Sequence, residues 1–277
     1  MLTDTSLEMA QLKRTLWAKL PLEKRLPQIA GLTRSVRSLT RWGIANRHPE
    51  WKDQQINAEF ARRVYGINPN EALFSSGMNT IEIPSALLPI LNACEKLNLR
   101  YRIGGSLASS LYGEPRATNG VDVVIDLTPE DADPFVRELN SEYVIYADRL
   151  RSAIIRQTCI NALHSETVFK IDIFPLKSRA YDQQAHSRCT KVEIEQEGQI
   201  HSLIFATPED ILIAKLEWYR KGNEQSEQQW KDILGLLQAD LVFLDFDYLE
   251  NWVKELGLWD LYQKALEAMK AKPHSNK

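Results

Sequence analysis

The chain has 277 residues, 44% of them hydrophobic and 26% charged, with a formal net charge of −3, which indicates a soluble globular protein with an ordinary core. No run of about 18 or more uncharged apolar residues occurs, and the amino terminus resembles no signal peptide, so we expect a cytoplasmic protein without a membrane span. Cys94, Cys159 and Cys189 are far apart and belong to no CxxC or Cys/His cluster. They therefore support neither a disulfide framework nor a zinc site.

The residues up to Gly77 carry 12 Lys and Arg against 7 Asp and Glu, so the basic part of the chain is amino-terminal. Apolar residues recur there at steps of three and four, which predicts one face of a helix that ends in the region from Trp42 to Pro49. They are Leu22, Leu26, Ile29, Leu32, Val36 and Leu39. Ile56, Phe60 and Val64 predict a second helix that ends before Tyr65 and Gly66.

Arg34, Arg37 and Arg41 are predicted to form a basic stripe on the opposite face of the first helix. Such a stripe is either a solvated surface or a contact for RNA phosphates or an acidic protein partner. No aromatic residues interleave with these arginines, which favours the solvated surface.

The pattern between Tyr65 and Glu82 changes to loop composition, with Gly66-Ile67-Asn68-Pro69-Asn70 and Ser75-Ser76-Gly77, and we place a linker there. Beyond it, strands are predicted to alternate with helices. An amphipathic helix is expected from about Ile83 to Leu97, followed by a short strand from Arg100 to Ile103.

A strand next runs into a helix through Gly104, Gly105 and Ser106. Without side chains at the two glycines, the backbone is open to close approach by an anion, and the helix N–H groups and the serine hydroxyl are suited to phosphate oxygens. Taken alone, such a turn is more often part of a simple loop. The next predicted strand, Val121 to Asp126, carries Asp122, and a later one, Val168 to Phe174, carries Asp172.

Together these motifs resemble the signature of the polymerase-β-like nucleotidyltransferase superfamily, which has a Gly-Gly or Gly-Ser turn, a short helix and then Asp-x-Asp on a strand. Asp122 matches the second aspartate of that motif, and Asp172 stands where the family has its third carboxylate. The segment from Thr207 to Tyr219 resembles the following helix of bacterial members similar to abortive-infection, or toxin-antitoxin, nucleotidyltransferases. The resemblance spans roughly Ile83 to Leu237, and the segment before Met78 resembles a small helical protein often found beside such enzymes.

The resemblance implies binding of a nucleoside triphosphate with Mg²⁺ or Mn²⁺, and transfer of a nucleotidyl group to a hydroxyl of tRNA, a protein or a small molecule. A metal pair held by carboxylates would align the attacking oxygen and neutralise the leaving pyrophosphate. Asp122 and Asp172 are the predicted catalytic and metal-binding residues. The alternative for both is that they are ordinary acids at strand ends.

One position departs from the family pattern. Counted from Ser106, the place of the first aspartate is taken by Gly120. Asp126 would lie roughly 13 Å from Asp122 along an extended strand, too far to replace the missing ligand, whereas Glu114 in the preceding loop is a candidate to swing inward. We expect the glycine to leave room for a carboxylate introduced at this position.

Arg116 and Lys215 complete the predicted site. Arg116 is placed to contact a phosphate or a carboxylate of the cluster, or else is a plain surface arginine. Lys215 matches lysines that reach the triphosphate in the family, or else is a solvated side chain beside an apolar face. Asp232 in the next helix is a candidate to orient it. Thr207 and Pro208 form a typical helix start, and Asp210 falls three residues after the cap.

The sequence thus predicts an α/β fold with a small mixed sheet flanked by helices. Residues 1–77 are expected to form a helical unit, 78–206 the nucleotidyltransferase-like core and 207–277 a helical region packed on it. Two functions stay open. One is an active nucleotidyltransferase, with the toxin-like role that the resemblance implies. The other is a degenerate copy that binds a nucleotide or a protein partner without turnover, with the amino-terminal helices as a built-in partner or inhibitor.

Overall fold

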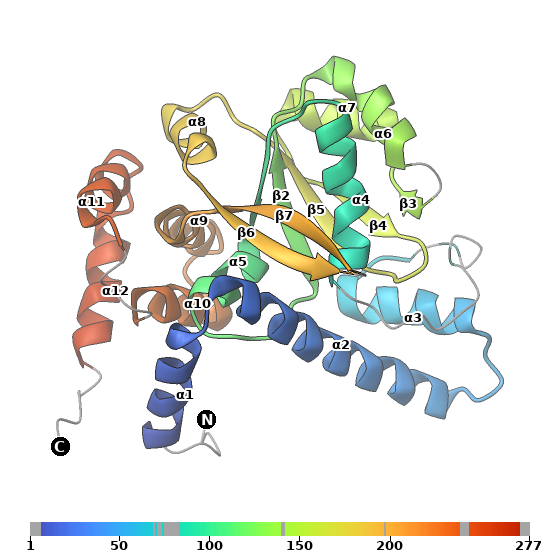
Figure 1. Cartoon of the computed structure of the whole chain (residues 1–277), viewed down its shortest axis with the longest axis horizontal. Coiled ribbons are helices and arrows are strands. Elements are labelled where there is room, and N and C mark those ends of the chain that lie inside the picture. Colours follow the sequence, from blue (N-terminus) through green and yellow to red (C-terminus); the bar gives the residue numbers. More distant parts are fainter. Residues whose placement is uncertain are drawn as a thin grey trace.

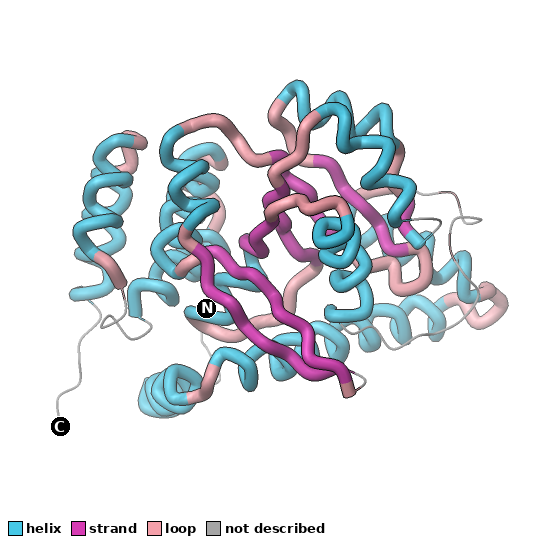
Figure 2. The backbone as a smooth tube through the Cα atoms, turned by 45° about the horizontal axis from the view of Figure 1, so that its top comes forward, coloured by secondary structure: helices cyan, strands magenta, loops and turns pink. Residues whose placement is uncertain are grey.

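The fold is a mixed α/β architecture with helices on both sides of one sheet (Figures 1 and 2), which confirms the predicted fold class. The computed structural model describes residues 7–68, 70, 74, 83–139, 142–196, 198–238 and 244–271. Within these residues, no helix has the length and apolar character needed to cross a membrane.

The helices are α1 (Leu7–Lys19), α2 (Leu22–Arg47), α3 (Asp53–Tyr65), α4 (Ile83–Lys96), α5 (Gly105–Tyr112), α6 (Ala132–Leu139), α7 (Ala147–Arg156), α8 (Ala180–Ser187), α9 (Pro208–Lys221), α10 (Glu227–Gln238), α11 (Phe246–Glu255) and α12 (Trp259–Ala271). The strands are β1 (Tyr101–Gly104), β2 (Gly120–Ile125), β3 (Tyr143–Val144), β4 (Ile160–His164), β5 (Lys170–Pro175), β6 (Cys189–Gln196) and β7 (Gln199–Ala206).

The described strands are hydrogen-bonded in the order β3-β4-β5-β2-β1-β7-β6. Strand β2 is central: it runs antiparallel to β1 and parallel to β5. Its residues alternate in burial, so Val121, Val123 and Ile125 are fully buried while Asp122 and Val124 on the other face are partly accessible. This period of two is what a strand with one polar face requires. It leaves one face of β1, β2 and β5 available for a site.

The helix α4 matches the predicted one. The helix α3 includes Tyr65, one residue beyond its predicted end, and stops there because Gly66 adopts a left-handed conformation with φ of 67°. Glycine takes this conformation at little cost, so it commonly terminates helices. The predicted linker after Tyr65 falls largely outside the described residues.

The orientation of α2 differs from the prediction. Its buried stripe begins with Leu26 and Ile29 but continues through Thr33, Arg37 and Arg41 to Ile44. The predicted apolar residues Leu32, Val36 and Leu39 are instead exposed, Leu39 to 68%. The expectation that Arg37 and Arg41 form a solvated stripe is therefore wrong. Arginine is rarely buried unless its donors are paired. Here Arg37 Nη1 and Nη2 and Arg41 Nη1 are hydrogen-bonded, whereas Arg37 Nε has no partner among the described residues.

The Arg37 side chain is 2% exposed and ties the amino-terminal helices to the sheet. Its guanidinium donates to the Tyr65 hydroxyl at 2.6 Å and to the backbone carbonyls of Thr167 and Val168 at 3.1 and 2.9 Å, just before β5. It also lies 4.5 Å from the ring centre of Phe60. The helix α2 therefore packs on the core through fixed hydrogen bonds as well as apolar contacts.

Two further polar contacts join α2 to the motif region. Arg25 donates to the Leu111 carbonyl at 2.8 Å, and the Thr33 hydroxyl accepts from the Thr118 amide at 3.1 Å. These bonds reach the end of α5 and the loop before β2. The amino-terminal helices therefore contact the segments that carry the predicted site.

We predict that Arg37→Met lowers the free energy of unfolding by about 2–4 kcal/mol. The substitution removes the hydrogen bond to the Thr167 carbonyl and one of the two bonds made by each of the Val168 carbonyl and the Tyr65 hydroxyl. Chemical denaturation monitored by circular dichroism measures the change. The matched control is Arg137→Met on the exposed side of α6, which should change stability by about 0.5 kcal/mol or less. Equal effects of the two substitutions would refute the role given to Arg37.

Candidate functional site

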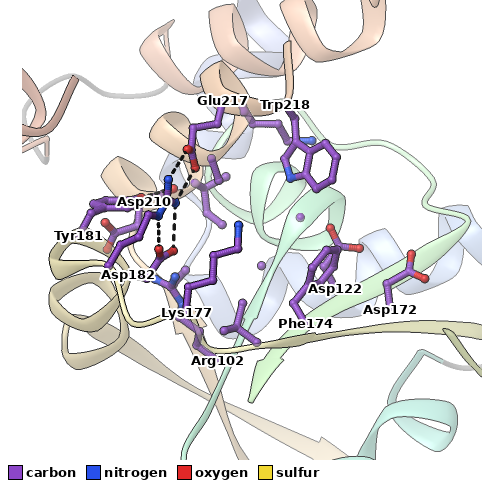
Figure 3. A pocket seen from close by; sticks show the side chains of 18 of the residues that line it. Arg102, Asp122, Asp172, Phe174, Lys177, Tyr181, Asp182, Asp210, Glu217 and Trp218 are labelled. Carbon is purple, nitrogen blue, oxygen red and sulfur yellow. Dashed lines mark hydrogen bonds and ion pairs between the residues drawn. The ribbon is translucent and has the colours of Figure 1, made fainter. Parts of the chain in front are cut away.

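A cavity of about 240 Å³ lies on the partly accessible face of β1, β2 and β5, beneath α9. Its walls include five of the residues singled out in the sequence: Gly104, Gly105, Asp122, Asp172 and Lys215. Figure 3 shows Asp122 and Asp172 near each other on the sheet, with Glu217 and Trp218 above them on α9. Residues more than 100 positions apart in the chain are thus brought to one site.

Strand register brings the two aspartates together. In the parallel pair β2 and β5, Asp122 is the direct partner of Asp172, and Gly120 is the direct partner of Lys170. Partners in a parallel pair project from the same face. One face of the sheet therefore carries a row of four positions, formed by Gly120, Asp122, Lys170 and Asp172.

The Gly-Gly turn packs against Asp122. Gly105 has φ of 59°, a conformation that suits glycine, and a Cβ at this position would overlap the Asp122 carboxylate. Glycine is therefore required for close approach of this carboxylate. Burial and the nearby Asp172 carboxylate raise the pKa of Asp122 to about 6, although Lys215 and Lys170 act in the opposite direction.

Ser106 stabilises the Gly-Gly turn through hydrogen bonds. Its hydroxyl is 2.5 Å from the Thr118 hydroxyl, which in turn donates to the Gly120 carbonyl at 2.6 Å. Ser106 does not line the cavity. Its contacts fix the start of β2, and its predicted role as a phosphate ligand stays a prediction.

Asp232 on α10 is hydrogen-bonded to two of the cations predicted for the site. It accepts from Lys215 Nζ at 2.7 Å and from Arg116 Nε and Nη2 at 3.1 and 2.9 Å. Lys215 is nearly buried, and these cations lower the pKa of Asp232 in spite of its burial. Asp232 thus orients Lys215 as the sequence suggested, while Arg116 pairs with Asp232 and not with Asp122 or Asp172.

The side chains around the two aspartates do not form the ligand set of the metal pair that the family resemblance implies. Asp172 accepts from Lys170 Nζ at 2.6 Å and also from Asn161 Nδ2, while Gly120 offers no side-chain ligand. Glu114 lies beside Gly235 of α10. Across the described residues, no group of three or more His, Cys, Asp or Glu side chains is placed to hold a metal ion. Hard cations such as Mg²⁺ need several oxygen ligands, and here one carboxylate is already bonded to an ammonium group.

Several cavity residues were not anticipated. Arg102, on β1, is 7% exposed, and its Nε and Nη1 have no hydrogen-bond partner among the described residues. Lys177, after β5, extends into the cavity (Figure 3). Arg179 is engaged by Asp182 and Glu217.

Aromatic side chains form another part of the wall. Trp218 on α9 is 50% exposed, and its ring centre is 6.3 Å from that of Phe174 on β5 in an edge-to-face arrangement. The exposed face of a tryptophan is suited to stacking with a flat ring. The cavity therefore combines cationic and aromatic walls.

A sequence signal for Arg102 was present but weak: it lies two residues before Gly104 on the same strand, and hence on the same face. Lys170 likewise lies two residues before Asp172. Lys177 and Arg179 follow β5 in a loop, and no spacing rule indicated that they turn back toward the cavity.

No protein-family model and no curated protein matches the sequence of this chain. Among solved structures, the chain is similar to the lincosamide antibiotic adenylyltransferase LnuA bound to lincomycin, at 14% identity and a TM-score of 0.35 over 56% of this chain and 96% of that one. It is also similar to a nucleotidyltransferase-like protein from Paracoccidioides brasiliensis, at 19% identity and a TM-score of 0.37 over 65% and 91% of the two chains. A third is ANT(2")-Ia in complex with adenylyl-2"-tobramycin, at 13% identity and a TM-score of 0.38 over 64% and 97%. At such low identities and TM-scores, these similarities assign no chemistry to the site. Its chemistry follows from the residues of this chain alone.

The expectation that Gly120 leaves room for a carboxylate is wrong. A Cβ at this position would lie 2.9 Å from the Lys170 carbonyl oxygen and 3.4 Å from Lys170 Cε. We predict that Gly120→Ala and Gly120→Asp each lower the free energy of unfolding by about 1–3 kcal/mol, because the backbone of β5 must shift. Gly31→Ala, in α2 with no atom within 4 Å of the added carbon, is the matched control and should be neutral or stabilising. Undiminished stability of Gly120→Ala would show that β2 and β5 separate easily.

The raised pKa of Asp122 predicts a pH dependence of stability. Because the folded state binds this proton more tightly than the unfolded state, the free energy of unfolding should fall as pH rises from 3.8 to about 6, and remain low above that. The neutral variant Asp122→Asn should be more stable than the wild type near neutral pH, by about 3 kcal/mol at most. Urea unfolding at about pH 4 and about pH 7 measures the difference. A difference that is the same at both pH values would contradict the raised pKa.

Proposed function

We propose that this chain binds a nucleotide in the cavity over β1, β2 and β5 and does not turn it over by nucleotidyl transfer. The observation that carries the proposal is the buried Arg102, whose Nε and Nη1 lack partners among the described residues, beside Lys177 in the same cavity. Buried donors without partners are costly, so a protein that keeps them generally satisfies them with a ligand or water.

The chemistry of this pair indicates an anion with several oxygen acceptors. A guanidinium carries a permanent positive charge and several N–H donors, which suit phosphate oxygens, and a nearby ammonium adds a second charge. Two other cations of the cavity are engaged in ion pairs, since Lys215 is bonded to Asp232 and Arg179 to Asp182 and Glu217. A third, Lys221, lies with its Nζ 5.1 Å from the ring centre of Trp218. Arg102 and Lys177 are therefore the groups best placed to meet the phosphates of a nucleoside triphosphate.

The aromatic wall favours a nucleotide over a simple phosphate. Trp218 offers a half-exposed ring at the same cavity, and Phe174 supports it from β5. A base that stacks on an indole gains about 1–3 kcal/mol without sequence-specific hydrogen bonds. We therefore assign the base to the Trp218 side and the phosphates to the Arg102 side.

The absence of turnover is inferred from the row of Gly120, Asp122, Lys170 and Asp172 on β2 and β5. Transfer to a tRNA, protein or small-molecule hydroxyl would need the carboxylate that Gly120 lacks, and Asp172 is bonded to Lys170. Loss of metal stabilisation worth several kcal/mol slows a reaction at least about a hundredfold. A nucleotide-binding module is thus favoured over the active, toxin-like transferase, and incubation with radiolabelled triphosphates and tRNA or protein should show no label transfer.

Binding is tested by calorimetry with the four common ribonucleoside triphosphates. We predict that Arg102→Met and Lys177→Met each weaken binding by about 10- to 100-fold, the loss expected for one or two charge-assisted hydrogen bonds. The control is Lys24→Met on the exposed side of α2, which should leave the affinity unchanged. The proposal fails if none of the triphosphates produces heat or a shift in melting temperature at millimolar concentration.

A further inference from the structure

The position opposite Gly120 is taken by Lys170, the first residue of β5. Its Cε lies 3.4 Å from the place where a Cβ of residue 120 would be. The lysine side chain therefore runs through the space beside the missing carboxylate. Its ammonium group reaches Asp172, with Nζ 2.6 Å from Oδ2.

This ammonium is held in place from more than one side. The side chains of Lys170 and Asp172 are 25% and 16% exposed, and Asn161 of β4 donates to the same carboxylate through Nδ2. Nζ also lies 5.8 Å from the ring centre of Tyr65, which belongs to α3. A partly buried ion pair with additional hydrogen bonds and an aromatic neighbour is stronger than an exposed surface pair.

We propose that the Lys170 ammonium is a built-in cation that takes the place of a divalent metal ion at the Asp122 and Asp172 carboxylates. The cavity then needs no metal ion to receive an anionic ligand. The part of the proposal that concerns nucleotide rests on the proposed function; the part that concerns metal exclusion does not.

Electrostatic repulsion and the limited space at position 120 both support the replacement of a metal ion by Lys170. A divalent cation that entered between the aspartates would have to separate Lys170 from Asp172 and then lie beside the displaced ammonium, where like charges repel strongly in a partly buried site. Gly120 and Lys170 are also complementary, because a side chain at position 120 would press on the Lys170 backbone. The lysine thus supplies positive charge at the site where the metal-binding pattern has lost a ligand.

The first experiment measures binding of Mn²⁺ alone by electron paramagnetic resonance. We expect the wild type to bind Mn²⁺ only weakly and Lys170→Met, which keeps the side-chain stem and removes the charge, to bind it at least about tenfold more tightly. Asp172→Asn in the Lys170→Met background should abolish the gain. Lys191→Met is the matched control, since Lys191 pairs with Glu193 at the same two-residue spacing on β6, and it should bind Mn²⁺ as the wild type does.

The second experiment measures ATP binding by calorimetry with excess EDTA and with excess Mg²⁺. We expect the wild-type affinity to differ by about twofold or less between the two conditions, and Lys170→Met to bind ATP more tightly with Mg²⁺ than without it. The inference is overturned if the wild type binds one Mn²⁺ tightly and loses it on Asp122→Asn, or if ATP binding by the wild type requires Mg²⁺.

These outcomes separate the two proposals. If ATP binds under neither condition, the proposed function fails, while the Mn²⁺ series still decides the role of Lys170. The comparison of wild type with Asp122→Asn does not use Lys170→Met, so tight Mn²⁺ binding that Asp122→Asn abolishes overturns the inference even if Lys170→Met does not fold.

Discussion

The parallel pairing of β2 with β5 is the constraint on which the site depends. The pairing is in register over six residues, so Gly120 faces Lys170 and Asp122 faces Asp172. A slip of one residue would turn every side chain of one strand to the opposite face, placing the aspartates in the apolar core. Such a slip is opposed by Val121 and Val123, which are fully buried on that face, and by the hydrogen bonds that link Ser106, Thr118 and Gly120.

The charges around the cavity are largely engaged within the protein, and this decides what is left for a ligand. Lys215 and Arg116 are bonded to Asp232, and Lys170 is bonded to Asp172. Arg102 and Lys177 line one part of the cavity, and the partly accessible Asp122 lines another. An anion would therefore be attracted to the Arg102 end and repelled near Asp122, which gives the cavity a defined polarity along the sheet face.

The sequence predicted what depends on local pattern. Alternating apolar residues indicated the strands of Asp122 and Asp172, and the Thr207-Pro208 signal located the start of α9, where the Thr207 hydroxyl accepts from the Asp210 amide. Asp232 was correctly paired with Lys215. The motif itself therefore carried most of the information about how the site is arranged.

What the sequence missed depends on contacts between distant segments. Arg37 is buried because it meets Tyr65, Thr167 and Val168, and none of these lies within one helix turn of it. The crowding at Gly120 arises from the backbone of another strand, which spacing along β2 does not reveal. Periodicity assigns a face to a helix from its apolar residues alone, so it fails where an arginine is the residue that packs inward.

The same distant contacts connect the amino-terminal helices to Lys170. Val168 is a β-branched residue with φ of 52°, a conformation that costs about 1–3 kcal/mol and persists only where the surroundings fix it. Its carbonyl accepts from both Arg37 of α2 and the Tyr65 hydroxyl of α3, at 2.9 and 3.0 Å, and its side chain is fully buried beside these helices. Lys170 follows two residues later, with Tyr65 beside its ammonium. The helices α2 and α3 thus hold the backbone that enters β5, and through it they set the position of the cation that faces Gly120.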